Sequence, residues 1–307
     1  MNGAKVRVEI VTPVHNRKDL TLRCLKSLSR LTLGELDVHI IIVDDGSTDG
    51  TGDAIRTQFP DVEIIAGNGD LWFTEGTNVG IRRALVYNPD FVLLINDDAV
   101  FDSEFLVRMV ETAQRHPRSI VGSLLLLWDT PHRLFQVAPV WDTLAGGWRH
   151  WRQQTVWTIP TSPWKVDIIV GNCLLVPSAV FTEAGLMDSR RFPNFGDAEF
   201  TPRLKRLGWT LLIEPGARVF CQPNARLPRI QKMNIRQKYD AFIGDLGNNY
   251  NLRRRFYENL AGAPSNLHAV LAMFIFLVRA VLGLHYEKRQ KDEEPLTKTF
   301  ASAVVDD

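Results

Sequence analysis

Short apolar runs alternate along the chain with segments in which apolar residues recur at helical spacing. The apolar runs predict strands at residues 6–14, 38–43, 62–65, 91–99, 120–128, 166–176, 209–214 and 217–221. The periodic segments predict helices at residues 19–33, 53–59, 82–87, 104–116, 177–184, 201–207 and 267–284. This alternation predicts an α/β fold with a mainly parallel, doubly wound sheet flanked by helices.

Prolines, glycines and acidic residues predict where several of these elements begin and end. Pro13 is expected to end the first strand, because proline cannot donate to a ladder. Asp19 is a candidate N-cap for the helix that follows, and Gly34 is expected to stop it. Within residues 166–176, Gly171 and Asn172 predict a kink or a close backbone approach.

Two of the predicted strands end in acidic residues. Asn96, Asp97 and Asp98 follow the fourth strand, and Asp44 and Asp45 follow the second. Open α/β sheets bind ligands at the carboxyl ends of their strands. Carboxylates this close repel one another unless a cation lies between them, and a divalent cation that carries substrate phosphates is a common solution. The alternatives are a solvated turn with an Asx cap at the fourth strand and a plain turn with a helix cap at the second.

A glycine-rich loop at residues 67–80 opens the third helix. Glycines let a loop approach a ligand closely, and the start of a helix offers free N–H groups. The loop has neither the Gly-Lys-Ser/Thr of a Walker motif nor GxGxxG spacing, which disfavours dinucleotide binding. Trp72 and Phe73 fit a pocket wall and plain core packing equally well.

Two further carboxylates, Asp197 and Glu199, lie at or near the start of the helix predicted at residues 201–207. The helix dipole stabilises negative charge at this position. A capping role for Asp197 alone is the alternative to a chemical role.

Overall charge and cysteine usage limit the kinds of binding partner and the cellular compartment that we expect for this protein. The 307 residues hold 36 Lys and Arg against 35 Asp and Glu, a formal net charge of +1, which argues against a nucleic-acid partner. Cys24, Cys173 and Cys221 are widely spaced, so we expect neither a zinc cluster nor a disulfide framework. The N-terminus leads directly into the first strand, which predicts no signal peptide and a cytoplasmic location.

The middle and the end of the chain differ in character from the alternating part. Residues 130–163 interleave tryptophans with basic residues, which fits an acceptor platform or a loop packed over the core: Trp141, Trp148, Trp151 and Trp157 with Arg149, His150 and Arg152.

Residues 267–284 are apolar but shorter than the roughly 20 residues of a membrane-spanning helix. Basic residues after them (Lys288, Arg289 and Lys291) favour a helix in the membrane interface, with burial in the protein or in a homodimer as the alternative. The expected organisation is a catalytic domain at 1–225, a helical extension at 226–291 and a charged, disordered tail at 292–307.

Over residues 6–222 the order of these motifs resembles the family 2 glycosyltransferases, which are inverting enzymes with a GT-A fold. Residues 43–51 (VDDGSTDGT) match the second-strand motif of that family almost letter for letter. Residues 12–17 (TPVHNR) look like its first-strand nucleotide motif. Within the family, the chain looks most like the bacterial rhamnosyltransferase-like branch.

The resemblance implies roles for the residues at these motifs. It places Thr12, Pro13, Asn16 and Arg17 along the nucleotide, and Asp44 or Asp45 on the base. It places Gly76 and Asn78 on the diphosphate-sugar side.

Residues 96–98 take the place of the DxD metal motif, with Asn at the first position. The resemblance therefore implies Asp98 as the ligand of Mg²⁺ or Mn²⁺, with Asn96 and Asp97 holding the sugar-nucleotide. Residues 197–199 take the place of the ED or DxE motif, so Asp197 is implied as the general base, with Glu199 beside it at the substrate. Cys221 stands where relatives commonly carry a histidine, which removes a histidine ligand from the expected set.

The resulting expectation is transfer of a sugar from a nucleoside-diphosphate-sugar (dTDP- or UDP-linked) to a hydroxyl of a growing or lipid-linked glycan at the cytoplasmic face of the membrane. A rhamnosyl donor is implied by the branch alone. Two other classes stay open: a sugar nucleotidyltransferase, and a non-catalytic nucleotide-sugar-binding partner in a polysaccharide assembly complex. The first would favour a glycine-rich, basic first loop, which residues 12–17 do not provide.

Overall fold

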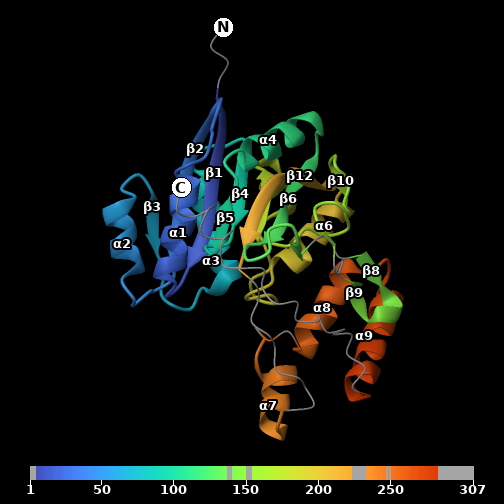
Figure 1. Cartoon of the computed structure of the whole chain (residues 1–307). Coiled ribbons are helices and arrows are strands. Elements are labelled where there is room, and N and C mark those ends of the chain that lie inside the picture. The colour runs from blue at the N-terminus through green and yellow to red at the C-terminus, as the bar shows by residue number, and fades with distance from the viewer. Residues whose placement is uncertain are drawn as a thin grey trace.

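A computed structural model describes residues 5–136, 140–149, 154–222, 233–246, 248 and 250–282. It has a central sheet with helices on both faces, followed by a helical lobe (Figure 1). The strands are β1 Val6–Val14, β2 Leu36–Asp44, β3 Glu63–Ala66, β4 Phe91–Ile95, β5 Ala99–Phe101, β6 Ser119–Leu127, β7 Leu134–Gln136, β8 Val140–Asp142, β9 Gly147–Arg149, β10 Trp164–Lys165, β11 Cys173–Pro177 and β12 Thr210–Cys221. The helices are α1 Lys18–Leu28, α2 Thr51–Gln58, α3 Trp72–Leu85, α4 Phe105–Arg115, α5 Ala179–Ala184, α6 Asp197–Arg206, α7 Ile235–Tyr239, α8 Leu252–Gly262 and α9 Asn266–Val281, with a 3₁₀ turn η1 at Thr143–Ala145 and a π turn η3 at Asp240–Gly244.

The sheet is mixed and mainly parallel, which confirms the predicted fold class. Its order is β10-β12-β6-β11-β4-β1-β2-β3, with β5 paired to β12 and β7 paired to β6. Strands β4, β1, β2 and β3 are parallel, β11 is antiparallel to both of its neighbours, and β12 is parallel to β6. The chain moves outward from β1 through β2 to β3 and then returns to the other side of β1 as β4. The reversal creates a topological switch point between the carboxyl ends of β1 and β4, where open α/β sheets bind ligands.

Pro13 does not end the first strand, contrary to expectation. β1 runs through it to Val14, and Pro13 is aligned with Val43 on β2. The pairing of β1 with β4 reaches only Val11, so the missing N–H of Pro13 falls beyond the β4 ladder. A proline is tolerated there for that reason.

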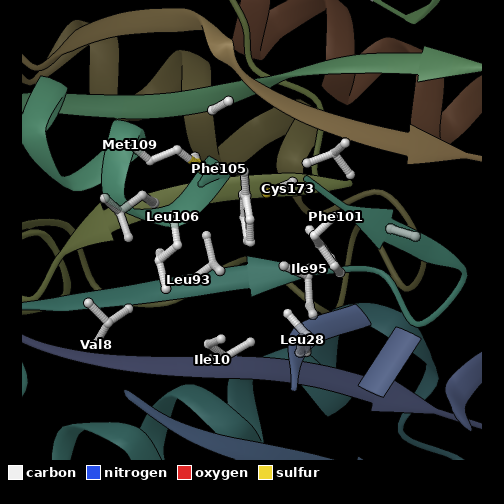
Figure 2. Close-up of a cluster of buried hydrophobic side chains, with 14 of the residues drawn as sticks. Val8, Ile10, Leu28, Leu93, Ile95, Phe101, Phe105, Leu106, Met109 and Cys173 are labelled. Atoms are coloured by element: carbon white, nitrogen blue, oxygen red, sulfur yellow. The ribbon is translucent and has the colours of Figure 1, made fainter. Parts of the chain in front are cut away.

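Two apolar clusters, one on each face of the sheet, hold the fold together. In one of them, strand residues such as Leu93 and Ile95 face Phe105 and Met109 of α4 (Figure 2). All four side chains are at most 1% exposed. The other face packs against α3 and α6, with Ile81 and Phe200 fully buried. Burial on both faces explains why these strands are apolar throughout rather than alternating.

Several predicted boundaries shift in the structure. Helix α1 begins at Lys18 with Arg17 at the N-cap, so Asp19 lies within the first turn. It ends at Leu28, before Gly34. The strand predicted at residues 166–176 is limited to β11, which begins at Cys173; the short β10 comes just before the predicted range, and residues 166–172 are not part of a strand. The two strands predicted at 209–214 and 217–221 form one strand, β12, with an irregularity between Glu214 and Arg218.

The C-terminal helices pack onto the domain that contains the central sheet. Helix α8 contacts α6, and α9 contacts η1 and β9, so the hairpin β8–β9 packs beside α8 and α9 (Figure 1). The tryptophan-rich insertion is therefore partly antiparallel, as one reading of the sequence expected, although His150, Trp151 and Arg152 lie outside the described residues. The basic segment 288–291 and the tail 292–307 also lie outside them. Among the helices that the structure describes, none combines the length and apolarity needed to cross a bilayer.

Candidate active site

The switch point brings the end of β1 and the end of β4 together. Arg17, the N-cap residue of α1, directs its guanidinium to the acidic turn after β4. One terminal nitrogen lies 2.9 Å from Asp97 Oδ1, and the other lies 2.8 Å from Asp98 Oδ2. The sequence motif at residues 12–17 and the motif at residues 96–98, which lie 80 positions apart, thus form one constellation.

Asp97 is the buried member of the acidic pair. Its side chain is 5% exposed, and burial raises its pKa to about 6, against the lowering effect of the Arg17 charge. Thr21 Oγ1 lies 3.4 Å from Asp97 Oδ2, so both carboxylate oxygens have a partner. Asp97 is therefore held in place by α1.

The acidic turn fits a hard divalent cation. Asn96 Oδ1 and Asp98 Oδ1 are buried, and neither has a hydrogen-bond partner in the part of the chain that the structure describes. Buried polar atoms are normally paired, and oxygen atoms of this kind are the ligands that Mg²⁺ and Mn²⁺ prefer. Across the described ranges, no three His, Cys, Asp or Glu side chains gather as a metal cluster. Magnesium is commonly held by one or two carboxylates together with substrate phosphates.

The loop after β1 is fastened to the loop after β2. Asn16 has a left-handed backbone with φ of 52°, and its Oδ1 accepts from the Thr48 N–H at 2.7 Å. Its own N–H donates to Ser47 Oγ at 2.9 Å. A ring nitrogen of His15 lies 2.5 Å from the Asp45 carbonyl. Asn16 thus sets the direction in which the chain enters α1 and fixes the position of Arg17.

Asp45 holds the glycine-rich loop. Its Oδ1 accepts from Gly69 N–H at 2.8 Å, and its Oδ2 accepts from the N–H groups of Leu71 and Trp72 at 2.9 and 3.2 Å. The residue is 5% exposed. Asp44 is more open, and its carboxylate accepts from Ser47 N–H at 3.0 Å. Of the two, Asp45 shapes the loop and Asp44 presents the accessible carboxylate.

Thr12, Gly76 and Asn78 lie inside the packing between elements. A Cβ on Gly76 would stand 2.8 Å from the Pro13 Cβ, so the glycine allows α3 to approach β1 closely. Asn78 is 2% exposed, and its amide bonds both backbone groups of Met187, at 2.9 and 3.1 Å. Thr12 is 1% exposed. The Asn78 side chain is thus engaged within the protein, and the expectation that Gly76 and Asn78 line the diphosphate-sugar side stays a prediction.

Asp197 is the first residue of α6, which begins four residues earlier than predicted. Its Oδ2 accepts from Gly171 N–H at 2.8 Å. Burial raises its pKa from the ordinary 3.8 to about 6, while the Gly171 hydrogen bond acts in the opposite direction and the Glu258 charge adds to the rise. A Cβ on Gly171 would lie 3.0 Å from the Asp197 Cβ, which explains the glycine and confirms the expected close backbone approach.

The segment Gly171–Asn172 connects Asp197 to the acidic turn. Gly171 bonds Asp197, and the carbonyl of Asn172 accepts from Asn96 N–H at 3.0 Å. Two adjacent backbone groups therefore fix the candidate base and the candidate metal turn relative to each other.

Glu199 is engaged within the protein. It pairs with Arg203, with Nε 2.6 Å from Oε1, and Arg203 also donates to the Leu186 carbonyl at 2.8 Å. Glu199 is 15% exposed on its side chain. It orients an arginine that fastens the chain before α6, which is a positioning role.

Two residues that help to position the site, Thr74 and Arg254, were not predicted from the sequence. Thr74 on α3 accepts from Gly196 N–H at 3.1 Å and so anchors the start of α6. Arg254 on α8 is 3% exposed, lies 3.9 Å above the Phe195 ring and pairs with Glu258 at 3.1 Å. The triplet at residues 253–255 was the available signal, but a basic triplet alone does not indicate which arginine is buried.

The cysteine in place of histidine does not supply a thiolate. Cys221 is 1% exposed and aligned with Ala99. Burial raises the pKa of its thiol well above the ordinary value, and the charge of Asp98 raises it further, which places Cys221 beside the acidic turn as a neutral side chain. Cys24 and Cys173 are also buried and unoxidised.

Comparison with known proteins gives the class to which this fold and site belong. Residues 9–132 match the profile of the family described as Glycosyl transferase family 2. The N-acetylglucosaminyl-diphospho-decaprenol L-rhamnosyltransferase of Mycobacterium tuberculosis is 27% identical over 220 residues, which cover 64% of this chain and 70% of that protein. The dTDP-rhamnosyl transferase RfbF of Shigella flexneri is 22% identical over 216 residues, 69% of each chain.

The fold is also that of solved glycosyltransferases. The crystal structure of GalNAc-T7 with UDP, GalNAc and Mn²⁺ superposes with a TM-score of 0.59 at 12% identity, over 91% of this chain. This chain spans 57% of the length of that structure. Its architecture is accordingly the GT-A fold. Residues 9–132 thus carry a match to Glycosyl transferase family 2, and the chain is a transferase enzyme of the glycosyltransferase class.

Proposed function

We propose that the protein transfers a sugar from a nucleoside-diphosphate-sugar to a hydroxyl of a growing, lipid-linked glycan, with inversion at the anomeric carbon. The observation that carries the proposal is the constellation in which Asn96–Asp98, Arg17 and Asp197 are fixed to one another through the Gly171–Asn172 backbone. It offers a cation site for a diphosphate on one side and a carboxylate base on the other.

On the donor side, Asp98 with Asn96 would hold Mg²⁺ or Mn²⁺, which when bound neutralises charge on the leaving diphosphate. Arg17 supplies a further positive charge at the same turn. Asp44 presents an accessible carboxylate to the base, and Asn16 and Asp45 hold the two loops that shape its pocket.

On the acceptor side, Asp197 is the general base. Its Gly171 hydrogen bond fixes one carboxylate oxygen, and the other takes the proton of the acceptor hydroxyl as that oxygen attacks the anomeric carbon. A pKa of about 6 leaves the group ionised at neutral pH yet basic enough to accept a proton. General-base catalysis of this kind contributes roughly 10²–10⁴-fold.

The donor and acceptor to test first follow from the relatives. One is named as a dTDP-rhamnosyl transferase and the other as a rhamnosyltransferase acting on N-acetylglucosaminyl-diphospho-decaprenol. We infer dTDP-rhamnose as the donor and a polyprenyl-diphosphate-linked glycan as the acceptor.

The C-terminal lobe supports contact with an anionic membrane surface, where such an acceptor resides. Helix α9 exposes six large apolar side chains along one face: Leu267, Val270, Leu271, Phe274, Val278 and Leu282. Its opposite face, with Ala269, Ala272 and Phe276, is buried. Residues 226–291 contain 12 Lys and Arg against four Asp and Glu, so the lobe is strongly basic. An apolar helix face with a basic surround is typical of interfacial helices.

The test is an assay of purified protein with dTDP-rhamnose, Mn²⁺ and a short-chain N-acetylglucosaminyl-diphospho-prenol, followed by NMR of the product linkage. We expect dTDP release that depends on the acceptor, and a product anomer inverted relative to the donor. Retention of configuration would contradict the proposal. Pyrophosphate release from a triphosphate and a sugar phosphate would identify a nucleotidyltransferase, and binding without turnover would identify a non-catalytic partner.

A further inference from the structure

Arg17 occupies the acidic turn as an internal cation. Its two terminal nitrogens bridge separate carboxylates, Asp97 at 2.9 Å and Asp98 at 2.8 Å, and its side chain is 39% exposed. A planar guanidinium suits two acceptors at once, which a lysine ammonium on a flexible stem does not. The guanidinium thus contacts both carboxylates from one position and offsets one of their two negative charges.

The two contacts differ in how strongly the fold supports them. Asp97 is 5% exposed on its side chain and has a second contact to Thr21, so both of its oxygens are engaged within the protein. Asp98 is 19% exposed, and only one of its oxygens is engaged. The bond to Asp97 is fixed by the surrounding packing, whereas the bond to Asp98 can be exchanged without disturbing the core.

The same turn carries oxygens that the fold leaves open for a cation. Asp98 Oδ1 and Asn96 Oδ1 are buried and lack a hydrogen-bond partner among the described residues. A divalent cation bound to these atoms would lie beside the Arg17 guanidinium. Two positive centres that share one carboxylate repel each other, and the repulsion is strong in a partly desolvated site.

We propose that Arg17 is a built-in counter-ion that a divalent cation displaces from Asp98 while Asp97 retains it. Before the metal binds, the Arg17 contact offsets one of the two negative charges of the turn. On loading, the exchange frees half of the guanidinium to donate to the diphosphate that arrives with the metal. The inference deepens the proposed function and rests on it for the identity of that diphosphate, but metal competition itself does not depend on sugar transfer.

The test measures binding of Mn²⁺ alone, by electron paramagnetic resonance of free Mn²⁺, to wild-type protein and to Arg17→Gln. Removal of the competing charge is expected to tighten Mn²⁺ binding about tenfold. The matched control is Arg56→Gln, which removes one positive charge from an exposed pair with Asp53 on α2 and should leave the affinity unchanged. Equal or weaker Mn²⁺ binding by Arg17→Gln would overturn the proposal, as would an equal gain in the control.

A second variant covers the case in which Arg17→Gln does not fold. Arg17→Lys keeps the charge but reaches only one carboxylate at a time, so its Mn²⁺ affinity should lie between those of wild type and Arg17→Gln, about threefold tighter than wild type. Affinity at or below that of wild type would contradict displacement. Undetectable Mn²⁺ binding at millimolar concentration in every variant would also overturn it, while the transfer assay, run with and without EDTA, would report separately on the proposed function.

Discussion

At Asp197, the folded protein holds a charge that its surroundings disfavour. Burial raises the pKa of this carboxyl to about 6 from 3.8. A shift of two pKa units corresponds to roughly 3 kcal/mol of differential interaction between the protonated and ionised forms. Burial thus disfavours the ionised form, which the proposed base requires, relative to the same form in water, although the group is still ionised at neutral pH; active sites commonly carry such a stability cost.

Asp197→Asn should therefore separate stability from activity. The amide keeps an oxygen for Gly171 N–H but has no charge to bury, so we expect a Tm at pH 7.5 equal to or above that of wild type, together with loss of transfer by at least 10²-fold. Thermal unfolding and dTDP release measure the two effects. Asp167→Asn, at an exposed pair with Lys205, is the control that should retain activity. Retained transfer in Asp197→Asn would remove it as the base.

The same group predicts opposite pH dependences for activity and stability. Because the folded pKa lies above the unfolded value, the unfolded chain loses this proton first as pH rises from 3.8 to about 6. The Asp197 contribution to the free energy of unfolding falls across that window and is constant above it. Activity requires the ionised form, so it should rise through about pH 6. A pH profile of kcat/KM that shows no inflection between pH 5 and 7, in wild type, would count against this assignment.

At the scale of elements, one buried amide joins α3 to the chain before α6. Asn78 bonds both the N–H and the C=O of Met187, 109 residues further along. Asn78→Ala leaves these two buried groups unpaired, each at a cost of about 1–3 kcal/mol. We expect a loss of roughly 2–4 kcal/mol in urea unfolding. Gln114→Ala, at an exposed position on α4, should change stability little, and an equal effect of the two substitutions would refute the structural role.

Helices, strands and motifs could be predicted from the sequence, whereas contacts between distant segments could not. The apolar runs and turn residues predicted most strands because both faces of this sheet are buried, which makes the pattern strong. Pairs such as Arg17–Asp97 and Asn78–Met187 depend on the topology that brings their elements together. The resemblance located Asp98 and Asp197, but only coordinates reveal that Asn78 and Glu199 have partners in the protein. Boundaries failed where backbone contacts decide them, as at Gly171 and the start of α6.

At the scale of the molecule, the C-terminal lobe connects the helix that begins at Asp197 to an exposed apolar surface. Helix α8 packs against α6, which begins at Asp197, and places Arg254 over Phe195. Helix α9 then presents its apolar face away from the core. The lobe therefore contacts α6 on one side and exposes an apolar helix face on the other, an arrangement that would suit the proposed lipid-linked acceptor.

Vesicle flotation tests this arrangement. Wild-type protein should float with vesicles that contain anionic phospholipid and bind neutral vesicles at least tenfold more weakly. Leu271→Asp combined with Phe274→Asp should abolish flotation without lowering turnover of a water-soluble acceptor analogue. Val86→Asp, at an exposed apolar position on the catalytic domain, is the control. Unchanged flotation in the double variant would contradict the proposal, and a concentration-dependent dimer lost in that variant would show that a second copy covers the face instead.

The most direct test of the account is metal-dependent recognition of a nucleoside diphosphate at the acidic turn. Thermal shift would be measured for wild type and Asp98→Asn with dTDP, UDP, GDP and ADP, each with and without Mn²⁺. A ligand that binds only the native state raises Tm by mass action. We expect that one diphosphate, dTDP, stabilises wild type in the presence of Mn²⁺ and has no such effect on Asp98→Asn. Stabilisation that is independent of Mn²⁺, or that persists unchanged in Asp98→Asn, would contradict it.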